Sequence, residues 1–318
     1  ISGSKNLEKV VSLGNIPFVN DTHKIGSNDI MTISAPLELY YCPKSKLVQL
    51  NIEVDKKILF PKSYPYTSST TKILRDNFSQ LRKQVDKNNF LKKNDLIIDI
   101  GSNDGNLLSN FNDEYRVLGV TPENVGKIAI KRGIPTIIDY FDNSAVKKIN
   151  KKYGKAKVIT ATNVFAHITE VNKLIKNIKK CLVHNGVFIS ESHYLLPLIE
   201  TNQYDTIYHE HLRYYSLTSL NYLLSKYQLE IFKAERIDTH GGSIRVYAAR
   251  KNIYKIDSSV KKIKKIEKNL EKKLFDFKDR ILDSKIKFYN LLSRLYKNKK
   301  NLKIAGISAP SRSTTLIN

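Results

Sequence analysis

The segment Tyr208–His211 reads Tyr-His-Glu-His and places a phenol, two imidazoles and a carboxyl group in four consecutive positions. Histidine is the side chain that exchanges a proton near neutral pH. A neighbouring carboxylate can orient an imidazole, and a tyrosine hydroxyl can donate to an oxygen that becomes negative. These groups suit removal of a proton next to a carbonyl group, followed by attack of that carbon on a methyl group. His167 and His240 could join them.

Two other interpretations of this segment remain open. A metal site is disfavoured, because adjacent side chains of a strand point to opposite faces and the H-E-x-x-H spacing of zinc proteases is missing. We therefore predict no metal there. A hydrogen-bonded structural cluster is the other alternative. Against it, five of the seven histidines lie near the ends of predicted strands, namely His167, His193, His209, His211 and His240.

A glycine-containing turn follows the first apolar run of the central region. Gly101 and Gly105 have the spacing G-x-x-x-G, and glycine lets the backbone approach a ligand closely. The G-x-G-x-x-G pattern that cradles a pyrophosphate is missing, and Asp99 and Asp104 would repel one. These acids suit a cofactor with an ammonium group and no phosphate, which describes S-adenosylmethionine, although similar turns occur in many α/β proteins. The predicted contacts are Asp99, Gly101, Ser102, Asn103, Asp104 and Gly105.

The ends of the next strands offer further groups for this cofactor. Thr121 lies 20 residues after Gly101, where an acid usually holds the ribose hydroxyls, and Glu123 follows two residues later. Which of the two holds the ribose stays open. Asp139 is expected to hold the adenine amino group, with Tyr140 and Phe141 against its faces, unless these rings belong to the core. Asn163 is expected beside the methyl donor; no proline follows it, which argues against methylation of exocyclic amines in nucleic acids.

The elements that position these residues alternate between strands and helices. Short apolar runs predict strands at 96–101, 117–120, 136–139, 158–161 and 186–189. Helical stretches are expected at 107–111, 124–132, 144–153 and 171–182. Strands that are apolar throughout and alternate with helices indicate a parallel sheet with both faces covered. The predicted fold is therefore α/β, with the Rossmann-like doubly wound sheet of class I methyltransferases.

The flanking regions have a different texture. Residues 1–72 predict a small N-terminal module with short strands, and 73–250 form the expected methyl-donor domain, with a helix at 73–90 and a last strand at 243–249. Residues 251–318 predict one or two long amphipathic helices at 253–298. A strand at 302–307 would then begin a further α/β unit.

Composition limits the class of protein. The chain has 318 residues, a formal net charge of +24 and two cysteines. Two cysteines make no disulfide framework and favour a reducing compartment, so we expect a cytoplasmic protein. No apolar run is long enough to span a membrane. The charge admits a basic RNA-binding protein or RNA methyltransferase, but no basic-aromatic motif supports it, and we expect no nucleic-acid partner. An NAD-dependent sugar-modifying enzyme is a further alternative; the oligomeric state stays open.

Six stretches carry a resemblance to a known family, including Tyr-Pro-Tyr-Thr-Ser-Ser at 64–69, residues 205–212 with the Tyr-His-Glu-His segment, and His-Gly-Gly-Ser-x-Arg-Val-Tyr at 240–247. The others are 98–108, 119–137 and 163–168, and residues 36–318 as a whole resemble the sugar C-methyltransferases of branched deoxysugar biosynthesis. The resemblance implies a zinc-binding module, a methyl-donor domain and a C-terminal Rossmann-like domain. It implies methylation at C3 of a nucleoside-diphosphate 4-keto-deoxysugar.

The resemblance also implies roles for individual residues. His211 would be the base, helped by Glu210, while Tyr208 and Tyr66 or Tyr64 would support the enolate or position the sugar. His167 would line the site. Further contacts to the substrate are expected from Tyr64, His209, His240, Ser243 and Arg245, although a structural salt bridge of Arg245 is an equal alternative.

Two departures from the family pattern affect these expectations. The zinc module uses paired cysteines, but this chain keeps only Cys42, with Ser45 and Ser2 where cysteines are expected. One cysteine cannot close a four-ligand site, so we predict no zinc unless His23 and further residues contribute. The chain also stops soon after residue 302, so the C-terminal domain is expected to be incomplete.

Overall fold

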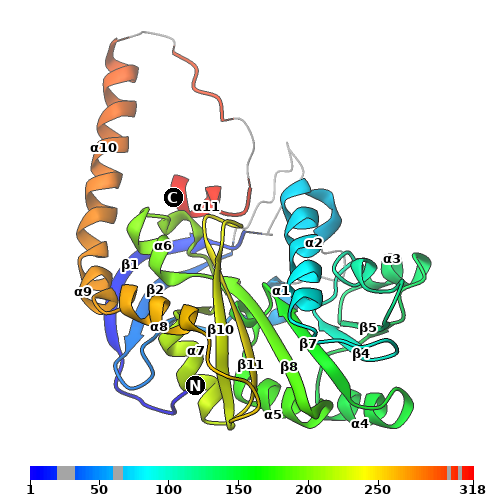
Figure 1. Cartoon of the computed structure of the whole chain (residues 1–318). Helices are drawn as coiled ribbons and strands as arrows, with labels where there is room; N and C mark the ends of the chain where they lie inside the picture. The colour runs from blue at the N-terminus through cyan, green and yellow to red at the C-terminus, as the bar shows by residue number, and fades with distance from the viewer. Residues whose placement is uncertain (20–32, 60–66, 299–301, 307–309) are drawn as a thin grey trace.

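The computed structural model describes residues 1–19, 33–59, 67–298, 302–306 and 310–318. A seven-stranded sheet with the order β10-β11-β8-β7-β4-β5-β6 forms its centre (Figure 1). β4 to β8 run parallel, and β11 runs antiparallel to both of its neighbours. The strands are β4 (Leu96–Ile100), β5 (Arg116–Thr121), β6 (Thr136–Ile138), β7 (Ala156–Thr162), β8 (Leu182–His193), β10 (Leu229–Ile237) and β11 (Ser243–Arg250).

The order of the strands places a switch point at the middle of the sheet. The chain begins the sheet at β4, proceeds to β6 at one edge, and then returns to β7 on the other side of β4. Ligands of open α/β sheets bind beyond the carboxyl ends of the strands at such a point. The predicted fold class is therefore confirmed.

Both faces of the central sheet are covered. All five residues of β4 are buried. Ile97 packs in one apolar cluster with residues of α2 (Lys72–Lys87), whereas its neighbour Ile98 packs in another with residues of α4 (Asn143–Lys152) and α5 (Val171–Cys181). Successive side chains of a strand point to opposite faces, which is why this run is apolar throughout.

A second, antiparallel sheet is built mainly by the N-terminal region. Its order is β1 (Glu8–Pro17), β2 (Ser34–Cys42), β3 (Leu47–Leu50) and β9 (Arg213–Tyr214). β9 comes from the middle of the chain, directly after the Tyr208–His211 segment, and pairs with β3. The N-terminal sheet is therefore completed by the segment that carries the candidate base. The division of the chain at residues 72 and 250 stays a prediction.

Helices follow the sheets at the C-terminal end. α8 (Ser258–Ile266), α9 (Leu270–Phe275) and α10 (Phe277–Asn298) succeed one another, and α10 extends away from the two sheets (Figure 1). The chain then returns, and α11 (Ser313–Ile317) lies beside η4 (Tyr204–Thr206), where the Thr315 hydroxyl donates to the Ile207 carbonyl at 2.7 Å. The C-terminal segment therefore ends next to the Tyr208–His211 segment.

Several expectations for secondary structure are confirmed and others are wrong. The six predicted strands between 96 and 249 are present, as is the helix at α2. The predicted strand at 302–307 is wrong over 302–306, which form no strand and are largely exposed, because no neighbouring strand pairs with them. The sequence patterns also missed β10, α6 (Leu195–Glu200) and α7 (Leu217–Ser225). β10 was missed because it is an edge strand in which charged residues are frequent.

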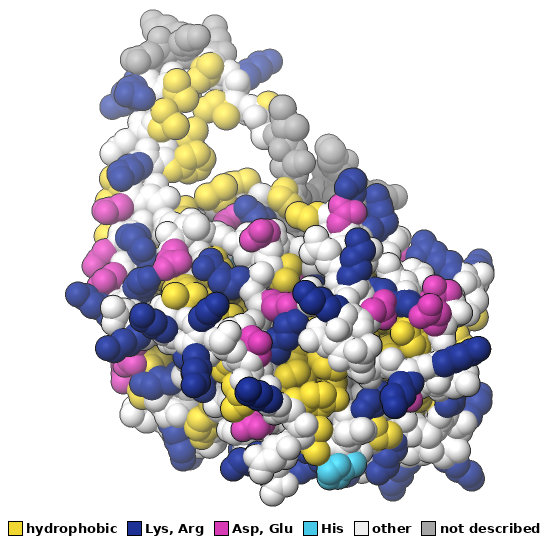
Figure 2. All heavy atoms as spheres, in the orientation of Figure 1, with side chains coloured by type: hydrophobic (Ala, Val, Ile, Leu, Met, Phe, Trp, Pro, Cys, Tyr) yellow, Lys and Arg dark blue, Asp and Glu magenta, His cyan; other side chains and the backbone are white. Residues whose placement is uncertain are grey.

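Charge and hydropathy of the described surface add two observations. Lys and Arg side chains are spread over the visible face among Asp and Glu, rather than gathered in one stripe (Figure 2). No helix within the described ranges is long and apolar enough to cross a membrane.

Candidate active site

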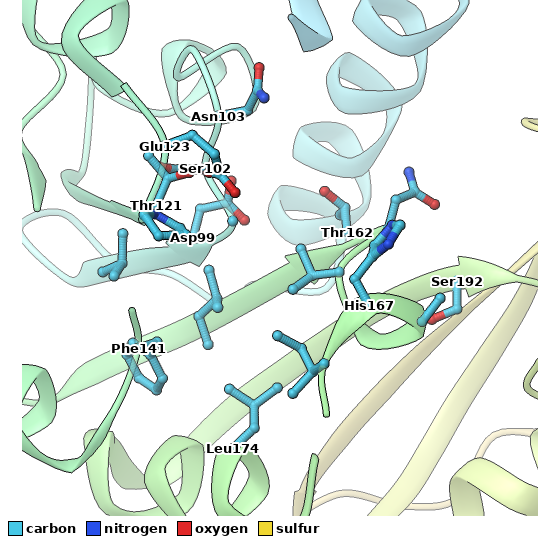
Figure 3. A pocket seen from close by; sticks show the side chains of 18 of the residues that line it. Asp99, Ser102, Asn103, Thr121, Glu123, Phe141, Thr162, His167, Leu174 and Ser192 are labelled. Carbon is cyan, nitrogen blue, oxygen red and sulfur yellow. Dashed lines mark hydrogen bonds between the residues drawn. The ribbon is translucent and has the colours of Figure 1, made fainter. Parts of the chain in front are cut away.

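A cavity of about 1110 Å³ opens at the carboxyl ends of β4, β5, β7 and β8. It brings the candidate methyl-donor site and the candidate base into one space. Figure 3 shows Asp99, Ser102, Thr121 and Glu123 on one side and His167 and Ser192 on the other. The predicted site residues that line it are Asp99, Gly101, Ser102, Asn103, Thr121, Asp139, Tyr140, Phe141, Asn163, His167, Tyr208, Glu210, His211 and His240. Tyr64 and Tyr66 lie outside the described residues.

The turn after β4 needs glycine for two reasons. Gly101 has φ +74°, a conformation that glycine adopts without steric cost. A Cβ atom there would also lie 2.4 Å from Cγ2 of Val164, in the loop after β7. The Gly101 backbone N–H donates to the Val120 carbonyl at 2.8 Å, which fixes the turn against β5. The turn therefore leaves open backbone at the cavity wall.

Asp99 is the buried acid of this turn. Its carboxylate accepts a hydrogen bond of 2.6 Å from the Thr160 hydroxyl, and only 2% of the residue is exposed. Burial raises the pKa of Asp99 to about 7, with the Thr160 hydrogen bond acting in the opposite direction. The buried Ser102 hydroxyl has no hydrogen-bond partner among the described residues. Asp99 has no counter-charge in the part of the chain that the structure describes, and together with the unsatisfied Ser102 hydroxyl it fits a ligand with an ammonium group.

Thr121 and Glu123, the two candidates for the ribose, are joined at the end of β5. The Thr121 hydroxyl donates to the Glu123 carboxylate, and both residues line the cavity. Glu123 is therefore the acid at this strand end, and Thr121 orients it. From the sequence alone the choice between Thr121 and Glu123 stayed open, because threonine occupies the strand-end position where an acid is usual.

The residues expected around adenine differ in exposure. Phe141 is buried and belongs to the core, as the alternative interpretation allowed, although it also reaches the cavity. Tyr140 is 52% exposed and lines the same wall. Asp139 accepts a hydrogen bond of 2.7 Å from the Tyr140 backbone N–H. The Phe141 ring thus belongs to the core, and the Tyr140 ring is exposed at the cavity wall.

Asp104 corrects one expectation about the cofactor. It was expected to face the ammonium group, but it is fully buried and does not line the cavity. Its carboxylate accepts from the Ser68 hydroxyl at 2.6 Å and pairs with Arg132 at 3.1 Å. Ser68 begins η1 (Ser68–Thr70), and its backbone N–H donates to the Asn103 side chain at 2.9 Å. Asp104 therefore ties the N-terminal region to the turn. Gly105 also lies off the cavity and packs against Ala129.

His211 has a defined protonation pattern. Its Nδ1 lies 3.2 Å from the Thr206 carbonyl oxygen, which can only accept, so Nδ1 carries the hydrogen. Nε2 is then the basic nitrogen, and the Tyr208 hydroxyl lies 3.2 Å from it as a donor. Burial, followed by the nearby His167 and His193, holds the pKa of His211 well below its usual value. The ring is thus neutral at pH 7 and able to accept a proton.

Glu210 was expected to assist His211, but its backbone carbonyl is hydrogen-bonded to His167. Glu210 is buried and lines the cavity, but the groups at hydrogen-bond distance from the His211 ring within the described ranges are those of Tyr208 and Thr206. The Glu210 backbone carbonyl instead accepts from Nδ1 of His167 at 2.9 Å. His167 is thereby set with Nε2 basic, and burial lowers its pKa to about 4. The two rings lie 5.0 Å apart.

Three residues expected to contact the substrate do not line the cavity. His209 turns to the N-terminal sheet, where Nε2 donates to the Ala35 carbonyl at 3.2 Å and the ring packs edge-on against Phe18. Arg245 is 1% exposed and pairs with Glu191 at 2.8 Å, so the salt-bridge alternative describes it. The Ser243 hydroxyl donates to the Thr239 carbonyl. Ser243 and Arg245 belong to β11, whereas His209 lies in a turn before β9, and each of the three is held by a partner away from the cavity.

His193 and Arg312 line the cavity although neither was predicted as a site residue. His193, at the end of β8, was noted only as one of the histidines near strand ends. Burial lowers its pKa to about 4. Arg312 belongs to the C-terminal segment and lines the cavity together with His211, from which it is separated by about one hundred positions in the chain. No local pattern signals such a contact.

Comparison with known proteins now adds to this geometry. A model of a methyltransferase domain matches residues 73–234, about half of the chain. Models of a putative zinc binding domain and of a C-methyltransferase C-terminal domain match residues 1–60 and 238–318. The chain belongs to the methyltransferase family whose domain model it matches over half of its length. The family resemblance and S-adenosylmethionine as the methyl donor are thereby confirmed.

Individual relatives and solved structures share 31% or less of their residues with this chain. C-methyltransferase NovU of Streptomyces niveus is 31% identical over 258 residues, which cover 78% of this chain and 60% of NovU. The chain thus spans about 60% of that relative's length. Magnesium protoporphyrin IX methyltransferase of Synechocystis PCC 6803 with bound S-adenosylmethionine has 12% identity and TM-score 0.44, covering 63% of this chain and 99% of its own. An S-adenosylmethionine-dependent methyltransferase of Clostridium acetobutylicum has 15% identity and TM-score 0.45, covering 57% and 93%.

The N-terminal region of this methyltransferase brings together the positions discussed for zinc. The Ser2 hydroxyl lies 3.4 Å from Cys42 Sγ, and the buried Ser45 follows in the adjoining turn. Within the described ranges no group of three metal-ligating side chains occurs. His23 lies outside those ranges, so the expectation of no zinc stays a prediction.

Proposed function

We propose that this C-methyltransferase moves a methyl group from S-adenosylmethionine to the carbon next to the ketone of a nucleotide-linked 4-keto-deoxysugar. One observation carries the proposal: the acidic strand ends of β4 and β5 and the basic nitrogen of His211 face the same cavity. A base must reach a carbon acid while a methyl donor lies beside it, and a shared cavity meets that need. The resemblance to sugar C-methyltransferases supports the choice of substrate.

The cofactor would be held by the residues that fit its chemistry. Asp99 would receive the ammonium group, Glu123 the ribose hydroxyls and Tyr140 the adenine face. Gly101 would leave room for the cofactor at the turn. When bound, S-adenosylmethionine supplies an electrophilic methyl group. Asn163, with its backbone N–H bound to the Glu191 carbonyl at 2.8 Å, would line the approach between cofactor and substrate.

Proton removal would fall to Nε2 of His211. The Thr206 carbonyl keeps the hydrogen on Nδ1, so the lone pair of Nε2 is directed toward the Tyr208 hydroxyl and the cavity. A substrate hydrogen at that position would be taken by Nε2, while the Tyr208 hydroxyl would donate to the oxygen that gains negative charge. His167, with Nε2 also unprotonated, could accept a hydrogen bond from a sugar hydroxyl. The 4-keto group makes the neighbouring hydrogen acidic enough for an imidazole.

The decisive variant is His211→Ala. We expect it to lower both solvent-deuterium exchange at the carbon next to the ketone and transfer of a labelled methyl group by about 100-fold or more, because the general base is lost. The affinity for S-adenosylmethionine should be unchanged in titration calorimetry, since His211 lies on the other side of the cavity. Nuclear magnetic resonance of the sugar follows the exchange, and mass spectrometry follows the label.

His184→Ala is the matched control. His184 is exposed near the beginning of β8, the opposite end from the cavity, so its loss should leave both rates unchanged. If exchange in His211→Ala stayed within a few-fold of the unchanged chain, His211 would not be the general base. If no 4-keto-deoxysugar nucleotide tested were methylated, the proposed substrate class would be wrong.

A further inference from the structure

Charged residues of both signs line the cavity, and one acid, Glu210, lies beside the candidate base. Acids from the ends of β4, β5 and β6 line the methyl-donor side, namely Asp99, Glu123 and Asp139. Three of the four lysines and arginines that line the cavity within the described ranges belong to α5. Of these, Lys173 pairs with Glu170 and Lys180 bonds Asn143, beside the predicted adenine side. The fourth cation is Arg312.

Arg312 belongs to the opposite end of the cavity. Its Nε contacts the Asp205 carboxylate at 2.7 Å, and Asp205 lies three residues before Tyr208. Thr315 bonds the Ile207 carbonyl at 2.7 Å and anchors the same segment. Both contacts join the C-terminal segment to the loop that carries the candidate base. The position of Arg312 is therefore tied to that of the reacting groups.

The orientation of this ion pair leaves positive charge toward the cavity. Arg312 lines the cavity, whereas its partner Asp205 does not. The side chain of Arg312 is 51% exposed and that of Asp205 18%. Asp205 engages Nε, and within the described ranges no hydrogen bond occupies the terminal nitrogens of the guanidinium. A guanidinium presents such donors in a planar fork that matches phosphate oxygens.

Two histidines surround the same end. His193 and His240 line the cavity, and burial lowers the pKa of His193 to about 4 and the pKa of His240 below its usual value. Both rings are therefore neutral at pH 7 and offer hydrogen bonds without charge. Arg312 is then the group at this end that can attract an anion through its charge.

We propose that Arg312 binds the diphosphate of the nucleotide-linked substrate and that Asp205 orients it for this contact. This inference rests on the proposed function and deepens it, because it makes the C-terminal segment a determinant of specificity for nucleotide-linked over free sugars. Each ligand then meets the complementary charge: the cationic methyl donor meets the acids, and the anionic diphosphate meets the guanidinium.

Binding of a nucleoside diphosphate tests this directly, without any methyl transfer. Thymidine diphosphate and uridine diphosphate are titrated into the whole chain by calorimetry. We expect Arg312→Gln to weaken binding of the diphosphate that the unchanged chain binds by about 10- to 50-fold, the loss typical of one charge-assisted contact. Arg312→Lys should recover only part, because it keeps the charge without the fork. Asp205→Asn should have a smaller effect than Arg312→Gln.

The control variant is Arg294→Gln, which removes an exposed arginine of α10 that does not line the cavity. It should bind both diphosphates as the unchanged chain does, and S-adenosylmethionine affinity should be equal in all variants. Equal binding by Arg312→Gln and the unchanged chain would overturn the inference, as would an unchanged chain that binds neither diphosphate. Arg312-dependent binding without methylation of any keto-sugar would instead contradict the proposed function and leave the phosphate contact standing.

Discussion

Asp99 and His211 are buried titratable groups whose neutral forms are both favoured by burial. For the acid this means a pKa raised to about 7, and for the imidazole a pKa held well below its usual value. The neutral imidazole is the form that can accept a proton. The neutral acid, in contrast, is the form that cannot attract an ammonium group. Burial therefore prepares His211 for its proposed role, while Asp99 ionises fully only above neutral pH or beside a cation.

The pKa of Asp99 predicts a pH dependence that Asp99→Asn should abolish. An unfolded aspartate titrates near 3.8 and the folded one near 7, so the folded chain binds more protons between these values. Its contribution to the free energy of unfolding therefore falls as pH rises through that window and is constant above it. The affinity for S-adenosylmethionine should rise with pH up to about 7. Urea unfolding at several pH values measures the free energy of unfolding, and calorimetry measures the affinity. If Asp99→Asn showed the same dependence on pH as the unchanged chain, the raised pKa of Asp99 would not be the cause.

At the scale of elements, the site depends on loops that pack against one another. The turn after β4 lies against the loop after β7 through Gly101 and Val164. The same turn is joined to η1 through the Ser68 contacts with Asn103 and Asp104. Because parallel strands end at one edge of the sheet, loops that are distant in sequence meet there and limit each other's side chains.

Gly101→Ala should therefore cost more than backbone strain alone. Gly133 is the control, because it has φ +78° with nothing within 4 Å of an added Cβ. We expect Gly133→Ala to lower the free energy of unfolding by about 1 kcal/mol. Gly101→Ala should lose about 1–3 kcal/mol more through overpacking, together with S-adenosylmethionine affinity. Val164→Ala in the Gly101→Ala background should recover part of the loss in urea unfolding. Equal costs at the two glycines would refute the close contact.

At the scale of the whole molecule, three distant regions hold the segment around the candidate base. β9 pairs with β3 of the N-terminal sheet, and the Leu212 backbone N–H donates to the Ala166 carbonyl at 2.8 Å, after β7. Thr315 bonds the Ile207 carbonyl from the C-terminal side. The segment is thus fixed by contacts that only the complete fold supplies, which keeps the base at one position relative to the methyl-donor side.

His209 connects this segment to the N-terminal sheet through its contacts with Ala35 and Phe18, so His209→Ala should lower the stability of the fold. Loss of the hydrogen bond to Ala35 and of the packing against Phe18 should lower the free energy of unfolding by about 1–3 kcal/mol. S-adenosylmethionine affinity should be kept at temperatures where the variant is folded. His209→Gln can still donate to the carbonyl and should recover part of the stability. Denaturant unfolding measures these differences. An unchanged midpoint in His209→Ala would show that the contacts of His209 do not stabilise the fold.

Local patterns in the sequence determined the alternation of strands and helices, the glycine turn, the role expected of Asp99 and the candidate proton-transfer group at 208–211, whereas the choice of His211 as base came from the family resemblance. Such features depend on periodicity and on residue types a few positions apart, which the chain carries wherever it folds. The tertiary structure alone decided which polar side chains face the cavity. Asp104, His209 and Arg245 looked equally suitable by type, but each turns to a partner from a distant segment, while Glu123, His193 and Arg312 reach the cavity. A side chain's direction depends on the partners that the fold brings to it, and neighbours in sequence do not specify them.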